Sequence, residues 1–178
     1  MSGPPGTGKT TLAHELAGAL GCPAVIRDEI KQGMVHGASA PDGSFDRKTL
    51  AVFSEVLGAL VRAGVTVVAE AAFQDKLWRP ILEPLVELAD IRMVRCVVPA
   101  AVAHTRISRR AERDPSRTAH ADRALLEAIA AGAYSVDSFV PISLDLPNLD
   151  VDTSDGYRPG LQRIMDFTRT GRSHSYKT

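Results

Sequence analysis

The sequence predicts one α/β domain in which helices cover both faces of a parallel sheet. Segments with apolar residues at helical spacing alternate along the chain with short β-branched runs, an order typical of strands joined by crossover helices. The length of 178 residues fits one such domain better than two. We therefore expect a single domain over residues 1–170 and a polar, frayed tail over 171–178.

The individual elements follow from the apolar runs and from the residues at their ends. Gly21 ends the first helix, and Gly64 ends the third. Asp28 and Asp46 are candidate N-caps, and Pro84 predicts a kink or break in the fourth helix. In chain order, we expect helices at 9–20, 29–34, 47–63, 77–89, 100–113, 121–133 and 159–170, strands at 24–26, 65–69, 91–98 and 149–151, and a loop at 35–46.

The charge balance argues against a large nucleic-acid surface. Lys plus Arg number 21 and Asp plus Glu number 21, whereas nucleic-acid-binding domains usually carry a basic excess. Cys22 and Cys96 have no metal-ligand spacing, and we expect both to be buried apolar residues. No apolar run approaches the roughly 20 residues of a membrane span, and no leader sequence is recognisable, so we expect a soluble, cytoplasmic protein.

The start of the chain carries the clearest chemical signal. The run Gly3-Pro4-Pro5-Gly6-Thr7-Gly8-Lys9-Thr10-Thr11 contains the pattern G-x-x-x-x-G-K-[ST]. Gly6 and Gly8 allow the backbone N–H groups to turn toward phosphate oxygens, and the helix that begins at Lys9 adds the positive end of its dipole. The pattern also predicts that Lys9 reaches the β- and γ-phosphates and that Thr10 binds Mg²⁺. We therefore expect this run to bind ATP and Mg²⁺; a plain glycine-rich turn would not require Lys followed by Thr.

The strand that should precede this loop is missing from the sequence. A loop of this pattern follows a buried strand, which normally lies in the middle of the sheet. Only Met1 and Ser2 precede Gly3. Without that strand, its two neighbours would be separated by about two strand spacings, roughly 9.6 Å. We expect either that the protein starts several apolar residues upstream of Met1 or that another segment fills the position.

Asp28 is the candidate catalytic base. It follows the strand predicted at 24–26, and the carboxyl end of a parallel strand faces the ligand crevice. Phosphoryl transfer needs a group that orients the acceptor hydroxyl and accepts its proton, which a carboxylate can do. The alternative is that Asp28 serves only as a helix N-cap, and one residue could do both. Arg27 and Lys31 are candidate contacts to an anionic acceptor, or else solvated surface charges.

Glu70 is the candidate magnesium ligand, together with Thr10. It ends the apolar strand predicted at 65–69, where a carboxylate can hold the metal directly or through water. The alternative is a strand-end charge that faces solvent. Phe73 and Arg79 follow shortly afterwards and are weaker candidates for contacts with the acceptor.

A stripe of arginines predicts a mobile lid over about residues 106–120. Arginine suits this position because its planar guanidinium grips phosphate oxygens and offsets the charge of the phosphoryl group in transfer. The alternative is a solvated helix face, partly paired with Glu112 and Asp114. We expect His120 to be structural, and no role follows from the sequence for Asp122. The stripe consists of Arg106, Arg109, Arg110 and Arg113, which repeat at helical spacing, and of Arg117.

Four features recur in this order in one superfamily: the run from Gly3 to Thr11, the run Arg27-Asp28-Glu29-Ile30-Lys31, the strand Val67-Val68-Ala69-Glu70 and the arginine stripe. The chain thus resembles the small P-loop kinases, which include phage-type polynucleotide 5′-kinases, zeta toxins, chloramphenicol phosphotransferases and gluconate kinases, and the bacterial AAA-family ATPases. The resemblance extends to about Phe167. It implies the three-layer sandwich of P-loop NTPases, here with a truncated first strand.

The resemblance also implies roles for single residues. The Asp that matches Asp28 acts on the acceptor hydroxyl in this superfamily. Arginines of the lid contact the phosphates of ATP, and these match Arg109, Arg110 or Arg113. The superfamily often has Asp in place of Glu70, which here adds a methylene. The segment 150–157 is expected beside the adenine. The catalytic candidates are therefore Lys9, Asp28, Arg110 and Arg113, with Arg109 among the nucleotide-binding residues.

The favoured function is transfer of the γ-phosphate of ATP to a hydroxyl of a small molecule. A nucleotide-dependent regulatory ATPase without an acceptor is an alternative, since no acceptor pocket is recognisable. A kinase of polynucleotide 5′-hydroxyl groups is a further alternative, which the neutral net charge disfavours. Neither the acceptor nor the oligomeric state follows from the sequence.

Overall fold

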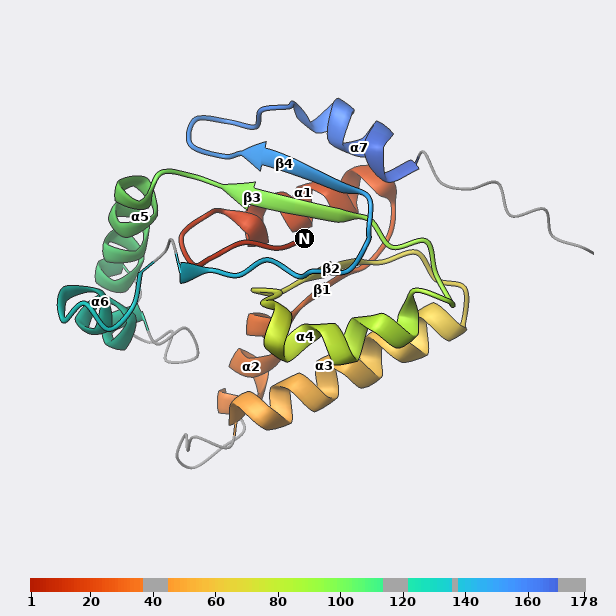
Figure 1. The fold of residues 1–178 in the computed structure, drawn as a ribbon, viewed down its shortest axis with the longest axis horizontal. Helices are drawn as coiled ribbons and strands as arrows, with labels where there is room; N and C mark the ends of the chain where they lie inside the picture. Colours follow the sequence, from red (N-terminus) through yellow and green to blue (C-terminus); the bar gives the residue numbers. More distant parts are fainter. Residues whose placement is uncertain (37–44, 114–121, 136–137, 170–178) are drawn as a thin grey trace, which may run out of the picture.

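The computed structural model describes residues 1–36, 45–113, 122–135 and 138–169 and confirms the parallel α/β fold (Figure 1). The strands are β1 (Ala24–Ile26), β2 (Val68–Glu70), β3 (Met93–Val97) and β4 (Asn148–Asp152). The helices are α1 (Lys9–Leu20), α2 (Arg27–His36), α3 (Phe45–Arg62), α4 (Asp75–Leu82), α5 (Ala100–Arg113), α6 (Asp122–Ala130) and α7 (Leu161–Arg169), with a 3-10 turn, η1 (Glu83–Leu85), after α4.

Two strand pairs and the first two residues form the sheet. β1 pairs in parallel with β2, and β3 pairs in parallel with β4. Met1 and Ser2 lie between the pairs: the Met1 nitrogen donates to the Ala69 carbonyl at 2.7 Å, and the Ser2 N–H donates to the Val94 carbonyl at 2.8 Å. The spatial order is therefore β1, β2, Met1–Ser2, β3, β4, and the predicted central strand is present only as its last two residues.

Neighbouring residues of each strand face opposite sides of the sheet, which creates two cores. Ile26 and Val94 belong to the core formed with α1 and α7, whereas Val25 and Met93 belong to the core formed with α3 and α4. Figure 1 shows these helix pairs on opposite sides of the strands. The predicted three-layer sandwich is therefore confirmed.

Most predicted elements differ from the observed ones by a few residues at their ends, and two of the differences have a clear physical reason. The strand predicted at 65–69 begins only at Val68, because β1 offers three partners on one side and the segment Met1–Ser2 on the other side is shorter still. The helix predicted at 77–89 ends at Leu82, and Pro84 lies in η1, since proline lacks the N–H that an α-helix needs. Most of the loop predicted at 35–46 lies outside the described residues. Within the part of the chain that is described, no helix is both long enough and apolar enough to cross a bilayer.

Candidate active site

The glycine-rich loop before α1 turns tightly against α5. Gly6 has a φ of 81°, and a Cβ atom there would lie 2.6 Å from the carbonyl oxygen of Ala103, so only glycine allows this contact. Gly8 has a φ of 75° and precedes the first residue of α1. The hydroxyl of Thr7 donates to the Pro4 carbonyl at 2.8 Å and closes the loop. The backbone thus has the left-handed turns that the spacing of the glycines predicts.

Lys9, Thr10 and Glu70 meet next to this loop. Thr10 Oγ1 donates to Glu70 Oε2 at 3.1 Å, and Lys9 Nζ lies 3.6 Å from Glu70 Oε1. Glu70 is only 1% exposed. The alternative of a strand-end charge that faces solvent is therefore wrong. A buried carboxylate needs a cationic or hydrogen-bonding partner, and the loop supplies both kinds.

The same oxygens suit a magnesium ion. Hydroxyl and carboxylate oxygens are hard donors, and Mg²⁺ in nucleotide sites usually combines one or two protein oxygens with phosphates and water. Thr10 and Glu70 fit such a donor set. They are the residues that would hold the ion when ATP is bound.

The strand register brings Asp28 to the same edge of the sheet as Glu70. Ile26 pairs with Glu70, and Asp28 lies two residues further along the chain. α2 begins at Arg27 instead of residue 29, so Asp28 lies in the first turn of the helix, where the dipole favours a negative charge. Asp28 is therefore not the N-cap that the sequence allowed. Its Oδ1 lies 3.3 Å from Nη1 of Arg27.

Arg27 and Lys31 share a carboxylate in this structure. Arg27 Nη2 and Lys31 Nζ donate to Asp46 Oδ1 at 2.8 and 2.9 Å. Burial alone would raise the pKa of Asp46, but the hydrogen bonds and charges of Lys31 and Arg27 outweigh it and lower this pKa. An anionic acceptor at these two cations would therefore compete with Asp46.

Arg106 joins the glycine-rich loop to the segment after β4. Its Nη2 donates to the carbonyls of Thr153 and Ser154 at 2.6 and 3.0 Å, and its Nη1 donates to the Gly6 carbonyl at 3.4 Å. Thr153 Oγ1 also donates to the Thr7 carbonyl at 2.6 Å. The segment expected beside the adenine is thus attached to the phosphate loop. The helical spacing predicted that Arg106 belongs to the arginine stripe, but it did not predict that Arg106 has a different role from the other arginines.

The remaining arginines of the stripe differ in their partners. Arg110 forms a two-pronged ion pair with Asp122 of α6, with Nε 2.6 Å from Oδ2, and Asp122 is buried. The hydrogen bond to Asp122 raises the pKa of Arg110, and the charge of Asp28 adds to this effect. Arg109 and Arg113 are exposed on α5. The rest of the predicted lid, with Arg117 and His120, lies outside the described residues.

The two weaker acceptor candidates do not join this group. Phe73 is 2% exposed, and its ring packs edge-on against Trp78, with ring centroids 4.8 Å apart. It therefore presents almost no surface to a ligand. Arg79 lies on α4, where Nη1 donates to Ser143 Oγ at 3.2 Å and Nη2 lies 3.8 Å from Glu83.

Several solved structures with the same fold are described as kinases. A provisionally assigned kinase from Chloroflexus aurantiacus has a TM-score of 0.75 at 26% identity, with 94% of each chain covered. The APS kinase of Mycobacterium tuberculosis, solved with AMPPNP and APS, has a TM-score of 0.59 at 18% identity, also with 94% of each chain covered. A gluconokinase from Sinorhizobium meliloti has a TM-score of 0.54 at 17% identity, covering 93% of this chain and 85% of that one.

Sequence comparison gives the family. No curated protein matches the chain. The model of the AAA domain family matches residues 1–134, which include the glycine-rich loop, Asp28, Glu70 and the arginine stripe. The chain has the fold of the P-loop kinases and belongs to the AAA domain family.

Proposed function

We propose that the chain is a P-loop kinase that transfers the γ-phosphoryl group of ATP to a hydroxyl group of a small molecule. The observation that carries the proposal is that Lys9, Thr10 and the buried Glu70 form one cluster at the sheet edge that also holds Asp28. Two of the structural neighbours, described as an APS kinase and a gluconokinase, support a small acceptor. We also propose that the reaction takes place in the cytoplasm, where ATP is available.

The reaction assigns one task to each group. The acceptor oxygen forms a bond to the γ-phosphorus while the bond to the β,γ-bridging oxygen breaks, and ADP leaves. The hydroxyl proton passes to the carboxylate of Asp28. The Lys9 ammonium and the N–H groups of the loop offset the negative charge of the phosphates. Mg²⁺ at Thr10 and Glu70 would neutralise charge on the β- and γ-phosphates.

The arginines of α5 complete the proposed site. Arg109 and Arg113 are exposed and would contact the phosphates of bound ATP. Arg110 is held by Asp122, within electrostatic range of Asp28. The ion pair fixes the position of the Arg110 guanidinium relative to the proposed base.

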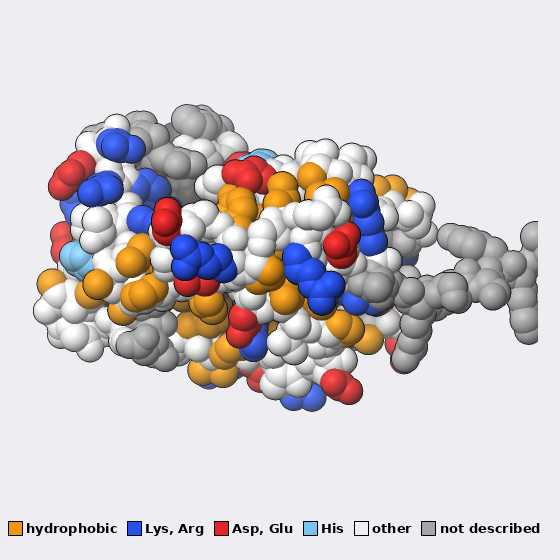
Figure 2. Space-filling view, turned by 90° about the horizontal axis from the view of Figure 1, so that it is seen from above, with side chains coloured by type: hydrophobic (Ala, Val, Ile, Leu, Met, Phe, Trp, Pro, Cys, Tyr) orange, Lys and Arg blue, Asp and Glu red, His pale blue; other side chains and the backbone are white. Residues whose placement is uncertain are grey.

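The charges on one face of the molecule and the net charge favour a small acceptor over a long nucleic acid. On the face seen in Figure 2, acidic and basic side chains of the described residues are interspersed, and neither sign forms a continuous stripe. A polynucleotide needs a basic track for its phosphates. The neutral net charge agrees with this view of the surface.

The decisive experiment is an acceptor screen with Asp28→Asn as the diagnostic variant. ATP and Mg²⁺ are incubated with sugars, gluconate, APS, nucleosides, amides and a 5′-hydroxyl oligonucleotide, and products are detected by the mass of one added phosphoryl group. We expect one class of small hydroxyl compound to be phosphorylated. Asp28→Asn should reduce transfer at least about 100-fold. It should change the Kd for ATP by less than about threefold.

The control is Asp145→Asn, which removes the same charge from an exposed position and should leave transfer unchanged. ATP binding without transfer to any acceptor would favour the regulatory ATPase instead. Transfer by Asp28→Asn at the wild-type rate would remove Asp28 from the mechanism. Transfer to the oligonucleotide alone would replace the small acceptor with a polynucleotide end.

A further inference from the structure

Beside Asp28 lies a cluster of three charged side chains to which the proposed reaction assigns no task. Arg27 Nη2 and Lys31 Nζ both donate to Oδ1 of Asp46, at 2.8 and 2.9 Å. Lys31 lies four residues after Arg27 on α2, so both cations extend from the same face of that helix. Asp46 belongs to the first turn of α3. One carboxylate oxygen from α3 thus binds two cations from α2.

The three side chains differ in burial. Those of Arg27 and Lys31 are 18% and 16% exposed, whereas that of Asp46 is 62% exposed. Cations that are largely withdrawn from water need an anionic partner, but a carboxylate that lies mostly in solvent loses little when water replaces its ion pairs. In addition, Nε of Arg27 is buried and has no hydrogen-bond partner among the described residues. Asp46 is therefore the member of the cluster that another anion can replace.

Arg27 also links this cluster closely to the proposed base. Its Nη1 lies 3.3 Å from Asp28 Oδ1, and its Nη2 lies 2.8 Å from Asp46 Oδ1. Both nitrogens are bonded to the same carbon of the planar guanidinium. A molecule whose hydroxyl lies on Asp28 can therefore reach the position of the Asp46 carboxylate through only a few bonds.

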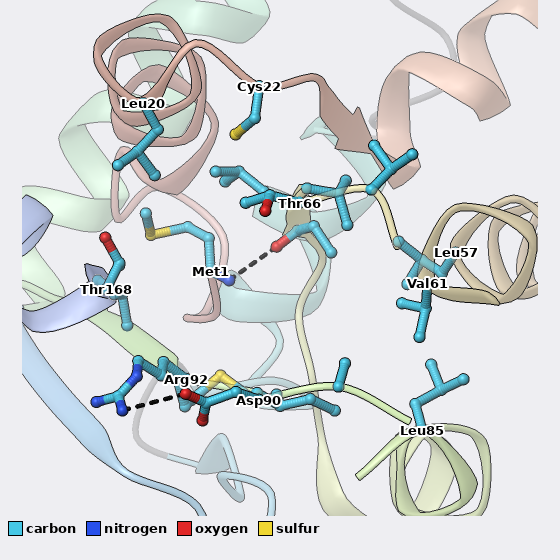
Figure 3. Close-up of a pocket in the computed structure, with 18 of the residues that line it drawn as sticks. Met1, Leu20, Cys22, Leu57, Val61, Thr66, Leu85, Asp90, Arg92 and Thr168 are labelled. Atoms are coloured by element: carbon cyan, nitrogen blue, oxygen red, sulfur yellow. Dashed lines mark hydrogen bonds and ion pairs between the residues drawn. The ribbon is translucent and has the colours of Figure 1, made fainter. Parts of the chain in front are cut away.

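A large cavity elsewhere in the structure does not suit the acceptor. This cavity of about 780 Å³ lies between β2 and β3, next to Met1, and the segments 64–69 and 89–94 form its long walls (Figure 3). It lies toward the amino ends of both strands, whereas Glu70 and the glycine-rich loop lie at their carboxyl ends. A hydroxyl bound there would not reach the γ-phosphate. The acceptor must instead bind near Asp28, next to the charged cluster.

We propose that Asp46 occupies the place of an anionic group of the acceptor. The acceptor is then a short hydroxy compound with a carboxylate or phosphate group, which bonds to Arg27 and Lys31 instead of Asp46 while the hydroxyl lies on Asp28. Asp46 determines specificity, because an anion that displaces it restores both ion pairs and a neutral compound does not. That this ligand is the acceptor rests on the proposed kinase function, but the exchange of anions at the two cations does not.

The first experiment measures binding without ATP. The probes are 3-hydroxypropanoate, 2-hydroxyethyl phosphate and the neutral 1,3-propanediol, and their Kd values are determined by calorimetry for the wild type, Asp46→Asn and Lys31→Met. The control is Asp90→Asn. Asp90 is the more exposed partner of Arg92 in an ion pair that lines the distant cavity, so its loss removes a similar pair away from Asp28 (Figure 3).

We expect Asp46→Asn to lower the Kd of at least one of the two anions by at least about fivefold, because the cations are then free to bind an anion in more of the chains. Lys31→Met should raise that Kd by at least about tenfold. The control should behave as the wild type. A Kd for both anions that is unchanged or raised in Asp46→Asn would overturn the proposal. So would 1,3-propanediol that binds as tightly as either anion.

A second measurement applies if Asp46→Asn does not fold. The NMR signal of the Asp46 carboxyl carbon is followed in the wild type during titration with each anion. A shift with an anion but not with 1,3-propanediol supports the displacement of Asp46 from Arg27 and Lys31. A signal that neither anion moves overturns it.

A transfer assay with ATP and Mg²⁺ separates this proposal from the proposed function. We expect phosphorylation of at least one of the two short anions and not of 10-hydroxydecanoate, whose hydroxyl lies too far from its carboxylate. Anion binding that depends on Asp46, without transfer to any compound, would support the exchange at Asp46 and contradict the kinase function. Transfer to neutral compounds alone would support the kinase function and overturn the role of Asp46.

Discussion

Thr10 and Glu70 are 60 positions apart in the sequence, yet the Thr10 hydroxyl donates to the Glu70 carboxylate at 3.1 Å. The contact exists because α1 starts beside the carboxyl end of β2. It brings the hydroxyl of Thr10 and the carboxylate at the end of β2 together, and Lys9 Nζ lies 3.6 Å from the same carboxylate. This is the pair that would hold Mg²⁺.

Glu70→Gln should therefore reduce magnesium-dependent transfer by at least about 100-fold. The amide keeps the size and one hydrogen-bond acceptor but removes the negative charge that attracts the cation. The measurement is the rate of ADP formation against Mg²⁺ concentration. Glu87→Gln, an exposed change of the same kind, is the control. A variant with the wild-type magnesium response would exclude Glu70 as a ligand.

Arg106→Met should weaken ATP binding by about tenfold and lower the thermal midpoint. The change leaves the carbonyls of Thr153 and Ser154 without their donor and releases the segment after β4 from the phosphate loop. Calorimetric titration with ATP measures the first effect. Arg163→Met removes an exposed arginine from α7 and should change neither quantity. Unchanged ATP affinity in Arg106→Met would show that the attachment is not needed for the nucleotide site.

Asp122→Ala should destabilise the fold by about 1–3 kcal/mol. Loss of one partner of a buried ion pair costs more, but one third of the Arg110 side chain is exposed and solvent screens the remaining charge. The midpoint of urea unfolding measures the effect. Glu127→Ala, exposed on the same helix, is the matched control. Equal stability of the two variants would indicate that the pair contributes little.

The Met1 ammonium should make stability depend on pH. Its pKa is lowered in the folded chain from its ordinary value of 8.0, so between the lowered pKa and pH 8.0 the unfolded chain binds a proton that the folded chain does not. Stability should therefore fall as pH decreases from 8.0 toward the lowered pKa, by at most about 1.4 kcal/mol per pH unit.

The clean comparison is between the free and the Nα-acetylated chain, with Met1 verified by intact mass. Acetylation removes the titrating group and should flatten this part of the stability profile, while other titrating groups contribute equally to both forms. Parallel profiles over the whole range would contradict the lowered pKa.

Local signals explain which features were predictable. α1 and α5 have the predicted bounds because each is bounded by nearby glycines, prolines or polar residues. The glycine-rich loop was predictable for the same reason, since its positive φ angles are set by residues within the loop. The start of β2 was not predictable from local residues, because the length of a strand depends on the strands that pair with it.

The arginine stripe shows what the sequence left undecided. Arg106, Arg109, Arg110 and Arg113 are equivalent by helical spacing, but Arg106 attaches to the phosphate loop and Arg110 pairs with Asp122. The sequence alone determined the order of elements, the phosphate loop and the edge of the sheet that carries the chemistry. Only the tertiary structure decided which side chains meet there and where the cavity lies, because those contacts depend on how α5, α6 and the strands pack across long sequence separations.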